Sequence, residues 1–301
     1  VHIYGSFTQY PCEAGSYQPQ TAQSGCYGAD SGHYVSSNAS NQQTPCLVGT
    51  YNPSMSSTSS ESCISADPGY FVQSEGSSSQ DNCLEGTYQP SEGSESCIDS
   101  PEGTFVLNAG QPEYIECSAG TYQPDKMQTS CIITEEGYFT DIPKSIVQIP
   151  CQAGTYQPSA GMASCLDADI GYYVSDEGQL SQQLNPFDFY TDSPASTFLW
   201  ACPVNHITII QGATSVDDCI IDTDGDRIID VDDLDDDGDG RLDSVDDCSP
   251  GLIGWISNSS TDIDGDGCHD VGEDTDDDGD LILDQYDAFS KDSTESIDTD
   301  S

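Results

Sequence analysis

Residues 117–131, CSAGTYQPDKMQTSC, begin and end with cysteine and carry a Gly-Thr-Tyr-Gln-Pro motif that starts three positions after Cys117. Versions of this segment also begin at Cys12, Cys46, Cys83 and Cys151, with a period of 34 residues that lengthens to 37 once. A second motif, glycine followed by an aromatic residue, comes after each closing cysteine, as in GYFT at residues 137–140. Short β-favouring runs between Gly, Pro and Ser predict hairpins and not helices.

Each repeated unit is too small to bury its own aromatic side chains. Only 35% of the residues are hydrophobic, and this share includes the 14 cysteines. Neighbouring units must therefore stack on one another, which predicts an elongated rod. We expect the repeated tyrosines to pack over the adjacent disulfides and not to form a stripe on which a ligand stacks.

The cysteines indicate a disulfide framework, because their number is even and their spacings recur. Such frameworks persist in oxidising compartments. A zinc site is the alternative, but the chain has no CxxC pair and its four histidines lie far apart. Pairing across repeats would leave Cys12 and Cys268 alone, unless a partner lies upstream, whereas pairing within the short loops uses every cysteine. We favour the second scheme, with the pairs Cys12–Cys26, Cys46–Cys63, Cys83–Cys97, Cys117–Cys131, Cys151–Cys165, Cys202–Cys219 and Cys248–Cys268.

Aspartate at regular spacing dominates the last part of the chain. Four segments place acidic side chains at offsets 0, 2, 4, 8 and 11 and leave offset 6 for a backbone carbonyl. These offsets match the ligand positions of the EF-hand loop around Ca²⁺, and glycine at offset 3 lets the backbone wrap tightly. The expected ligands are Asp222, Asp224, Asp226, Ile228, Asp230 and Asp233; Asp235, Asp237, Asp239, Arg241, Asp243 and Asp246; Asp262, Asp264, Asp266, Cys268, Asp270 and Glu273; and Asp276, Asp278, Asp280, Ile282, Asp284 and Asp287.

This spacing favours bound calcium over a solvated acidic tail. Magnesium fits less well, because it demands octahedral geometry and is reluctant to lose its water. Carboxylates held this close repel one another without a metal, so we expect ion binding and folding of the segment to be coupled. Extracellular calcium modules bind at ~10⁻⁴ to 10⁻³ M. We therefore expect permanent structural ions and no calcium signalling.

Two parts of the chain resemble known families. The C-x2-GTYQP motif with its closing cysteine is similar to ephrin-receptor-like and tumour-necrosis-factor-receptor-like repeats, which implies that the first two cysteines of each unit pair. These units hold two cysteines instead of four or six, so ligand binding is not carried over. Residues 222–251, DTDGDRIIDVDDLDDDGDGRLDSVDDCSPG, resemble thrombospondin type 3 repeats. That resemblance implies a chain wound around calcium ions and braced by disulfides. Dockerins share the DxDxDG ladder, but the paired helices they need are missing here.

The sequence divides into five cysteine-rich repeats over residues 1–170, an irregular sixth unit over 171–219 and thrombospondin type 3-like repeats over 220–301. The expected fold class is small disulfide-rich all-β or irregular repeats in a rod, followed by a helix-poor, calcium-wound, aspartate-rich segment. The sixth unit contains an aromatic-rich insertion with Phe187, Phe189, Tyr190, Phe198 and Trp200. These aromatic residues either pack locally or form a docking surface.

Charge and motif content argue against several functions. The formal net charge of −49 disfavours nucleic acids and anionic membranes, because both are bound through Lys and Arg. No apolar run approaches the ~20 residues of a membrane span. Paired carboxylates are typical of glycosidases, but no apolar pocket is evident that would raise one pKa. A GxSxG nucleophile motif is also missing. We expect that the chain is not an enzyme.

These features predict a secreted, extracellular or cell-surface protein that self-associates as the calcium-stabilised subunit of a fibre, sheath or filament. The alternatives are a calcium-dependent adhesin or receptor-like ectodomain for a glycan or protein ligand, and the stalk of a larger secreted protein. Asn38 and Asn258 lie in glycosylation sequons. The chain begins at Val1 without a signal peptide, and Asp298 and Asp300 start a further aspartate motif. We therefore expect a piece of a longer protein.

Overall fold

The structure is a computed structural model that describes residues 10–294. It confirms the expected fold class of small antiparallel hairpins with disulfides, followed by an aspartate-rich segment. The helical elements in the described residues are the single-turn 3-10 helices η1 (Ser60–Ser62), η2 (Val216–Asp218) and η3 (Asp243–Val245). None of the helices in the described part is long and apolar enough to cross a membrane. The further motif expected at Asp298 and Asp300 lies outside the described residues.

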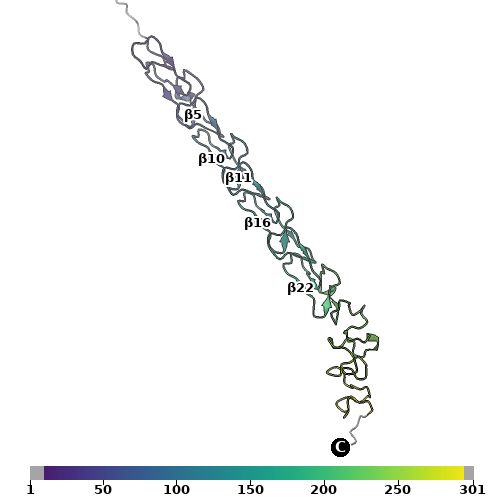
Figure 1. Cartoon of the computed structure of the whole chain (residues 1–301). Helices are drawn as coiled ribbons and strands as arrows, with labels where there is room; N and C mark the ends of the chain where they lie inside the picture. The colour runs from purple at the N-terminus through teal and green to yellow at the C-terminus, as the bar shows by residue number, and fades with distance from the viewer. Residues whose placement is uncertain (1–9, 295–301) are drawn as a thin grey trace, which may run out of the picture. The chain divides into compact units, whose positions relative to one another are not determined.

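Residues 10–294 contain twelve antiparallel hairpins, some of which are labelled in Figure 1. They are β1 (Ser16–Tyr17) with β2 (Tyr27–Gly28), β3 (His33–Tyr34) with β4 (Thr44–Pro45), β5 (Thr50–Tyr51) with β6 (Ile64–Ser65), β7 (Tyr70–Phe71) with β8 (Asp81–Asn82), β9 (Thr87–Tyr88) with β10 (Ile98–Asp99), β11 (Thr104–Phe105) with β12 (Ile115–Glu116), β13 (Thr121–Tyr122) with β14 (Ile132–Ile133), β15 (Tyr138–Phe139) with β16 (Ile149–Pro150), β17 (Thr155–Tyr156) with β18 (Leu166–Asp167), β19 (Tyr172–Tyr173) with β20 (Gln183–Leu184), β21 (Phe189–Tyr190) with β22 (Trp200–Ala201), and β23 (His206–Ile207) with β24 (Ile220–Ile221).

Contacts divide the chain into two compact units. One comprises Val1–Cys151 and Gln157–Cys165, and so contains the hairpins from β1 to β16. The other comprises Gln152–Tyr156 and Leu166–Ser301, and so contains the strands β17 to β24 and the aspartate-rich segment, whereas the loop between β17 and β18 belongs to the first unit.

The structural repeat is a single hairpin of 17 residues, half of the period visible in the sequence. The motif that begins with cysteine and the glycine–aromatic motif each form one hairpin with the same register; for example, Tyr122 pairs with Ile132 and Phe139 with Ile149. Cysteine-closed hairpins therefore alternate with cysteine-free ones along most of the chain. The two hairpins with longer loops, β5–β6 and β23–β24, accommodate the extra residues in η1 and η2.

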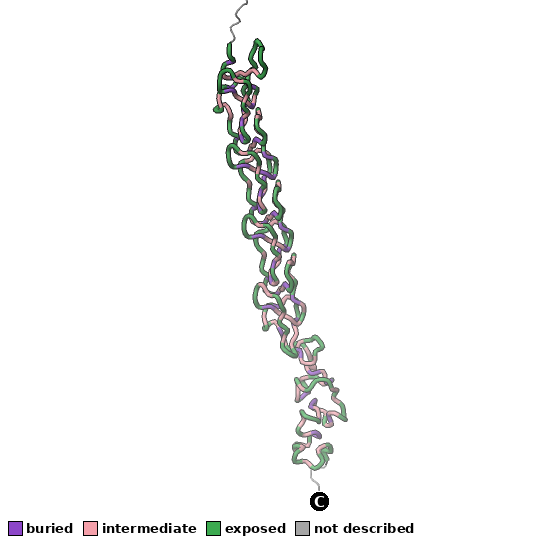
Figure 2. Tube along the Cα trace, turned by 90° about the vertical axis from the view of Figure 1, so that its left-hand side faces the viewer, coloured by how far each residue is buried: buried purple, intermediate pink, exposed green. Residues whose placement is uncertain are grey.

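The core of the hairpins is two columns of buried side chains, and each column takes one residue from eleven of the twelve hairpins. Figure 2 shows these buried residues as short stretches that recur along the hairpins. The first column contains Cys12, Ala29, Cys46, Ala66, Cys83, Ser100, Cys117, Thr134, Cys151, Ala168 and Asn185. The second contains Val35, Asn52, Val72, Gln89, Val106, Gln123, Thr140, Gln157, Val174, Thr191 and Thr208. Burial is so limited that bonds across each hairpin must supply much of the stability.

Backbone hydrogen bonds join each hairpin to the next. The Gly86 N–H donates to the Val106 carbonyl and the Ser100 N–H donates to the Gly86 carbonyl, both at 2.9 Å. Equivalent bonds recur at 17-residue steps, such as Gly103 N–H to the Gln123 carbonyl at 2.7 Å. Successive hairpins are therefore linked by a ladder that does not depend on side-chain identity.

Glycine is required where a hairpin meets the hairpin two places further along. Gly120 has a φ of +84°, and a Cβ there would overlap the carbonyl oxygen of Gly161. The same position holds Asp188 in β21–β22 and Asn205 in β23–β24, both with positive φ. In the described residues no hairpin lies two places beyond these last two, so a side chain fits there without a clash.

The cysteine-free hairpins carry a different brace at the position of the disulfide. Gln182 stands where a closing cysteine would be; its Nε2 donates to Asp169 Oδ2 at 2.8 Å, and the Asp169 N–H donates to Gln182 Oε1 at 2.6 Å. The same reciprocal pair joins Asp30 to Gln43, Asp67 to Gln80 and Glu135 to Gln148. An acid–amide pair therefore replaces the covalent bond in four hairpins. The other two cysteine-free hairpins lack this pair. In β11–β12 the acid is replaced by proline and the amide by Tyr114, and in β21–β22 the acid is replaced by proline and the amide by Leu199.

This equivalence predicts that a disulfide can be added to β19–β20. Ala168 and Gln182 occupy the positions that Cys151 and Cys165 occupy in β17–β18, where the Cα atoms are 5.8 Å apart. The double variant Ala168→Cys/Gln182→Cys is expected to form the bond during oxidative folding and to gain about 3 kcal/mol, less the lost hydrogen bonds. Thermal unfolding with and without reductant measures the gain, and Ala168→Cys alone is the control. A double variant that keeps two free thiols would contradict the equivalence.

The segment expected as an aromatic insertion contains a complete hairpin. Residues 185–201 form β21–β22, in which Tyr190 lies opposite Trp200 just as Tyr122 lies opposite Ile132 in β13–β14. Two consecutive cysteine-free hairpins, β19–β20 and β21–β22, thus replace the usual alternation. Because Cys202 follows Cys151 by 51 residues, which is the usual 34 plus 17, the irregularity in sequence is one additional cysteine-free hairpin.

Candidate metal centres

The aspartate-rich segment folds as four loops with one shared hydrogen-bond pattern. The carboxylate at offset 0 accepts from the backbone N–H at offset 5, at 2.9 to 3.2 Å. The carboxylate at offset 4 accepts from the N–H at offset 6, at 2.7 to 2.8 Å. Because short-range bonds from aspartate to the backbone hold each turn, the loops need no flanking helix or strand.

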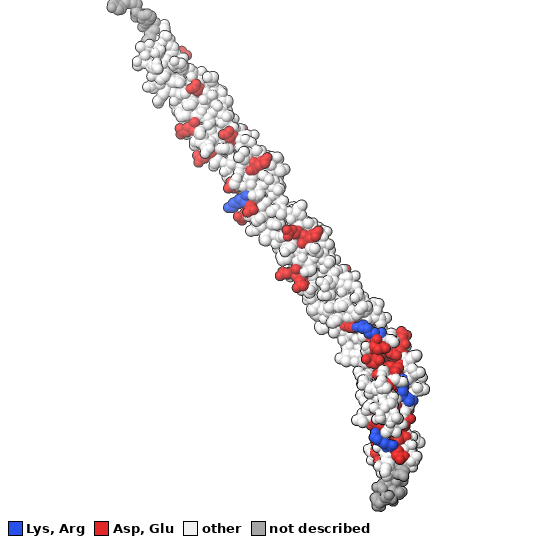
Figure 3. All heavy atoms as spheres, viewed as in Figure 1, with Lys and Arg blue, Asp and Glu red and all other residues white. Residues whose placement is uncertain are grey.

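In each loop the carboxylates at offsets 0, 2 and 4 converge. One oxygen from each lies within 4.8 Å of the others, which is a separation that one metal ion can bridge. The four clusters are Asp222, Asp224 and Asp226; Asp235, Asp237 and Asp239; Asp262, Asp264 and Asp266; and Asp276, Asp278 and Asp280. Figure 3 shows how acidic side chains gather on this segment of the visible face.

The aspartates expected as ligands at offset 8 brace the loop through one carboxylate oxygen. Asp230, Asp243, Asp270 and Asp284 each accept from the backbone N–H at offset 1, at 2.8 to 3.0 Å. Their own N–H groups donate to the carbonyl at offset −1, which ties the two ends of the turn together. None of these four belongs to the convergent cluster of its own loop.

The carbonyls expected as ligands at offset 6 belong to Ile228, Arg241, Cys268 and Ile282. Their N–H groups are used by the aspartate at offset 4. Among residues 10–294, their carbonyl oxygens accept no backbone or side-chain hydrogen bond. These oxygens are therefore available as ligands.

Three of the four ligands expected at offset 11 lie near the carboxylate cluster of their own loop, and the fourth does not. The negative charges of Asp233, Asp246 and Asp287 interact with cluster carboxylates of their own loops. In the third loop that neighbour is Asp274, one residue later than the expected Glu273. Glu273 instead accepts from the N–H groups of Leu252, at 2.9 Å, and His269, at 3.4 Å.

The spacing to the following loop could have identified Asp274 as the carboxylate near the third cluster. Asp233 stands two residues before the second loop, and Asp274 likewise stands two residues before the fourth. The third loop is one residue longer than the first, so counting from its start gives Glu273 and counting back from the next loop gives Asp274. The closing carboxylate keeps its distance from the loop that follows.

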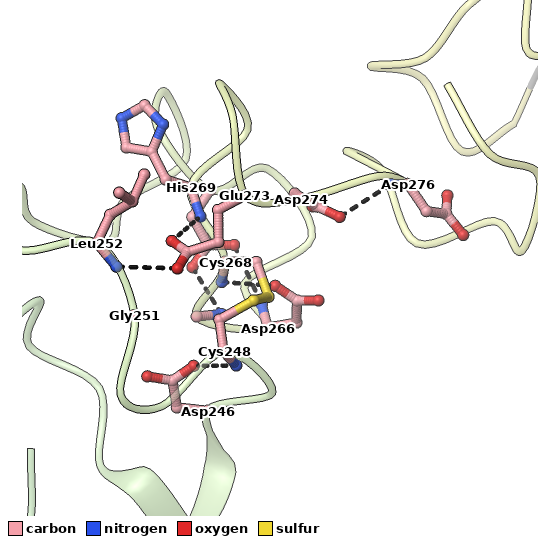
Figure 4. The surroundings of a disulfide bond; sticks show 12 residues. Asp246, Cys248, Gly251, Leu252, Asp266, Cys268, His269, Glu273, Asp274 and Asp276 are labelled. Carbon is pink, nitrogen blue, oxygen red and sulfur yellow. Dashed lines mark hydrogen bonds between the residues drawn. A yellow bond between two sulfur atoms is a disulfide. The ribbon is translucent and has the colours of Figure 1, made fainter. Parts of the chain in front are cut away.

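Glu273 connects the third loop to the disulfide region, as Figure 4 shows. Its two oxygens face the backbones of Leu252 and His269. The disulfide between Cys248 and Cys268 lies beside them, with Cα atoms 5.2 Å apart. This bond closes the connection between the second and third loops and so holds the two clusters in one compact stretch.

Several cluster oxygens are buried without a hydrogen-bond partner. Asp239 is fully buried, Asp278 is 6% exposed, and one oxygen of each accepts no hydrogen bond. Buried carboxylate oxygens are normally paired, because an unpaired one is costly. All the converging atoms are hard oxygens, with no thiolate or imidazole among them. The donor set fits a hard divalent cation.

Burial and mutual repulsion shift the titration of these carboxyls. Burial raises the pKa of Asp246 to about 6, and the neighbouring charges of Asp237 and Asp239 add to the rise. Burial likewise raises the pKa of Asp264 to about 6, with help from Asp266. Protons therefore compete with a metal for these oxygens at mildly acidic pH.

The structure contains the seven disulfides of the within-loop pairing scheme, with Cα–Cα distances of 5.2 to 5.8 Å. Together with the paired-strand hairpins, they form cysteine-rich repeats. No protein-family model matches the chain, and the search of curated proteins found no match either.

Proposed function

We propose that the four aspartate clusters bind calcium as permanent structural ions, in the manner of thrombospondin type 3 repeats. Oxygen-only ligands, free carbonyls at offset 6 and buried unpaired carboxylate oxygens support this proposal. Magnesium is a poorer match, because it retains more of its water. The cysteine-rich hairpins resemble ephrin-receptor-like and tumour-necrosis-factor-receptor-like units, from which no ligand is carried over.

We further propose that the protein is an extracellular structural subunit of a cell-surface fibre, sheath or filament. The observation that carries this proposal is that nearly every small unit has a brace of its own: a disulfide, an acid–amide pair or an aspartate cluster. Disulfides suit an oxidising compartment, and calcium sites of this type suit millimolar calcium. Such a chain resists unfolding without a large core.

Exposed apolar side chains supply a contact for self-association. Trp200 and Phe198 are 50% and 56% exposed, and their rings meet edge to face at 5.0 Å. Phe189, on the neighbouring strand, is half-buried. An exposed aromatic pair of this kind marks a contact surface. We assign it to the joint between successive subunits.

Negative-stain microscopy tests the assignment. Wild-type protein in calcium is expected to form filaments, and Phe198→Ser/Trp200→Ser to remain dispersed while its hairpins stay folded. Ile132→Ser is the matched control, because Ile132 occupies the position of Trp200 in β13–β14 and is 43% exposed. Filaments that persist in the double variant would refute the assignment of the joint. A wild-type protein that never polymerises would refute the filament.

A ligand-binding ectodomain is the second candidate, and one observation favours it. A hollow of about 470 Å³ beside Trp200 is lined by Tyr190, Asp192 and Phe198. An aromatic wall with a carboxylate suits a glycan or a peptide side chain. Saturable binding of such a ligand to the monomer would favour this candidate over the filament.

A further inference from the structure

A fifth group of carboxylates spans the junction of the third and fourth loops, because Asp270 is at offset 8 of the third loop and Asp277 at offset 1 of the fourth. Asp270, Asp274 and Asp277 each place an oxygen within 4.8 Å of the others. The ammonium group of Lys291 lies 2.9 Å from Asp270 Oδ2 and 3.0 Å from Asp277 Oδ2. A cationic side chain of the protein therefore contacts two of the three carboxylates.

Two of these carboxylates are withdrawn from solvent. Asp277 is 4% exposed and Asp270 is 8% exposed. Oδ1 of Asp277 and Oδ2 of Asp274 are buried and accept no hydrogen bond. Buried carboxylates that meet in one place need a counter-charge, since removing them from water is expensive. Lys291 supplies one, although its own side chain is 54% exposed.

We propose that Lys291 is the resident cation of this fifth cluster and stands where a metal ion would otherwise bind. The inference rests on the calcium binding proposed above for the other four clusters. A single ammonium leaves three carboxylates with an excess of negative charge, whereas a divalent ion would neutralise more of it. Lys291 holds the place because it is tethered to the same chain, which gives it a high effective concentration.

Removing the ammonium should therefore open a new metal site. Lys291→Met keeps most of the length of the side chain and removes its charge. Equilibrium dialysis with radioactive calcium is expected to find one more bound ion per chain in this variant than in the wild type. Lys291→Arg, which keeps the charge, is expected to bind the wild-type number. Lys291→Met/Asp277→Asn is expected to lose the additional ion.

The results separate this inference from the function on which it rests. Wild-type protein that binds no calcium would refute both. Wild-type protein that binds calcium, together with a Lys291→Met variant that binds the same number of ions or fewer, would refute the role of Lys291 alone. An additional ion that survives Asp277→Asn would place the new site elsewhere and would also overturn the proposal.

Discussion

Removing calcium with a chelator is expected to unfold residues 222–287 and to leave the hairpins folded. The loops are held by hydrogen bonds to aspartates whose clustered charges repel one another. When the free calcium concentration is 100 times the Kd of a site, that site contributes about 2.7 kcal/mol to the free energy of unfolding. Four such sites act on one short segment. The hairpins have their own disulfides and backbone ladder. Unfolding is therefore expected to stop where the hairpins begin.

Hydrogen exchange followed by mass spectrometry measures this effect. The N–H groups of Gly267 and Leu281, which donate to Asp262 and Asp276, should exchange slowly in calcium and rapidly after chelation. The N–H of Ser100, in the hairpin ladder, should exchange at the same rate in both conditions. Equal exchange of residues 222–287 with and without calcium would show that the clusters do not depend on a metal.

Gly120→Ala is expected to destabilise its unit by about 3 kcal/mol or more. A left-handed conformation costs an alanine ~1–2 kcal/mol, and forcing atoms into a packed site costs ~1–3 kcal/mol. The added Cβ would meet the backbone oxygen of Gly161, and a backbone cannot move aside as a flexible side chain can. Calorimetric unfolding of the variant and the wild type gives the difference.

Gly25→Ala is the matched control. A Cβ at Gly25 meets nothing within 4 Å, and its backbone is not in the left-handed region. Its unfolding temperature should therefore equal that of the wild type. Asn205→Ala should lose only the ~1–2 kcal/mol of the left-handed conformation, because Asn205 already carries a side chain at positive φ without a clash. Wild-type stability of Gly120→Ala would mean that the hairpins are not packed as closely as described.

The disulfides and the carboxylate clusters could be predicted from the sequence, but the 17-residue length of the structural repeat could not. Aspartate offsets are a local signal, so the convergent carboxylates could be predicted from spacing. The disulfide scheme was favoured because it is the one that leaves no cysteine alone. The 17-residue period was hidden because Gln148 and Gln182 look nothing like the cysteines whose place they take. Only the shared register shows that the two kinds of hairpin are equivalent.

The roles of individual aspartates needed the structure for a different reason. Asp230 and Asp224 have the same side chain, yet one holds the backbone and the other enters the cluster. The fifth cluster depends on a contact between Lys291 and Asp270 across 21 positions, which no loop motif encodes. Contacts of this kind come from the path of the chain between the loops.

The two adjacent cysteine-free hairpins, residues 168–201, make this stretch the most extensible part of the cysteine-rich repeats under mechanical load. A cysteine-closed hairpin cannot lengthen, because its disulfide carries the tension past the loop. A hairpin held by the acid–amide pair of Asp169 and Gln182 can unravel and release about 60 Å of chain, at ~3.3–3.6 Å for each of 17 residues. Stretch would therefore be taken up here first, and reversibly, since no covalent bond has to break.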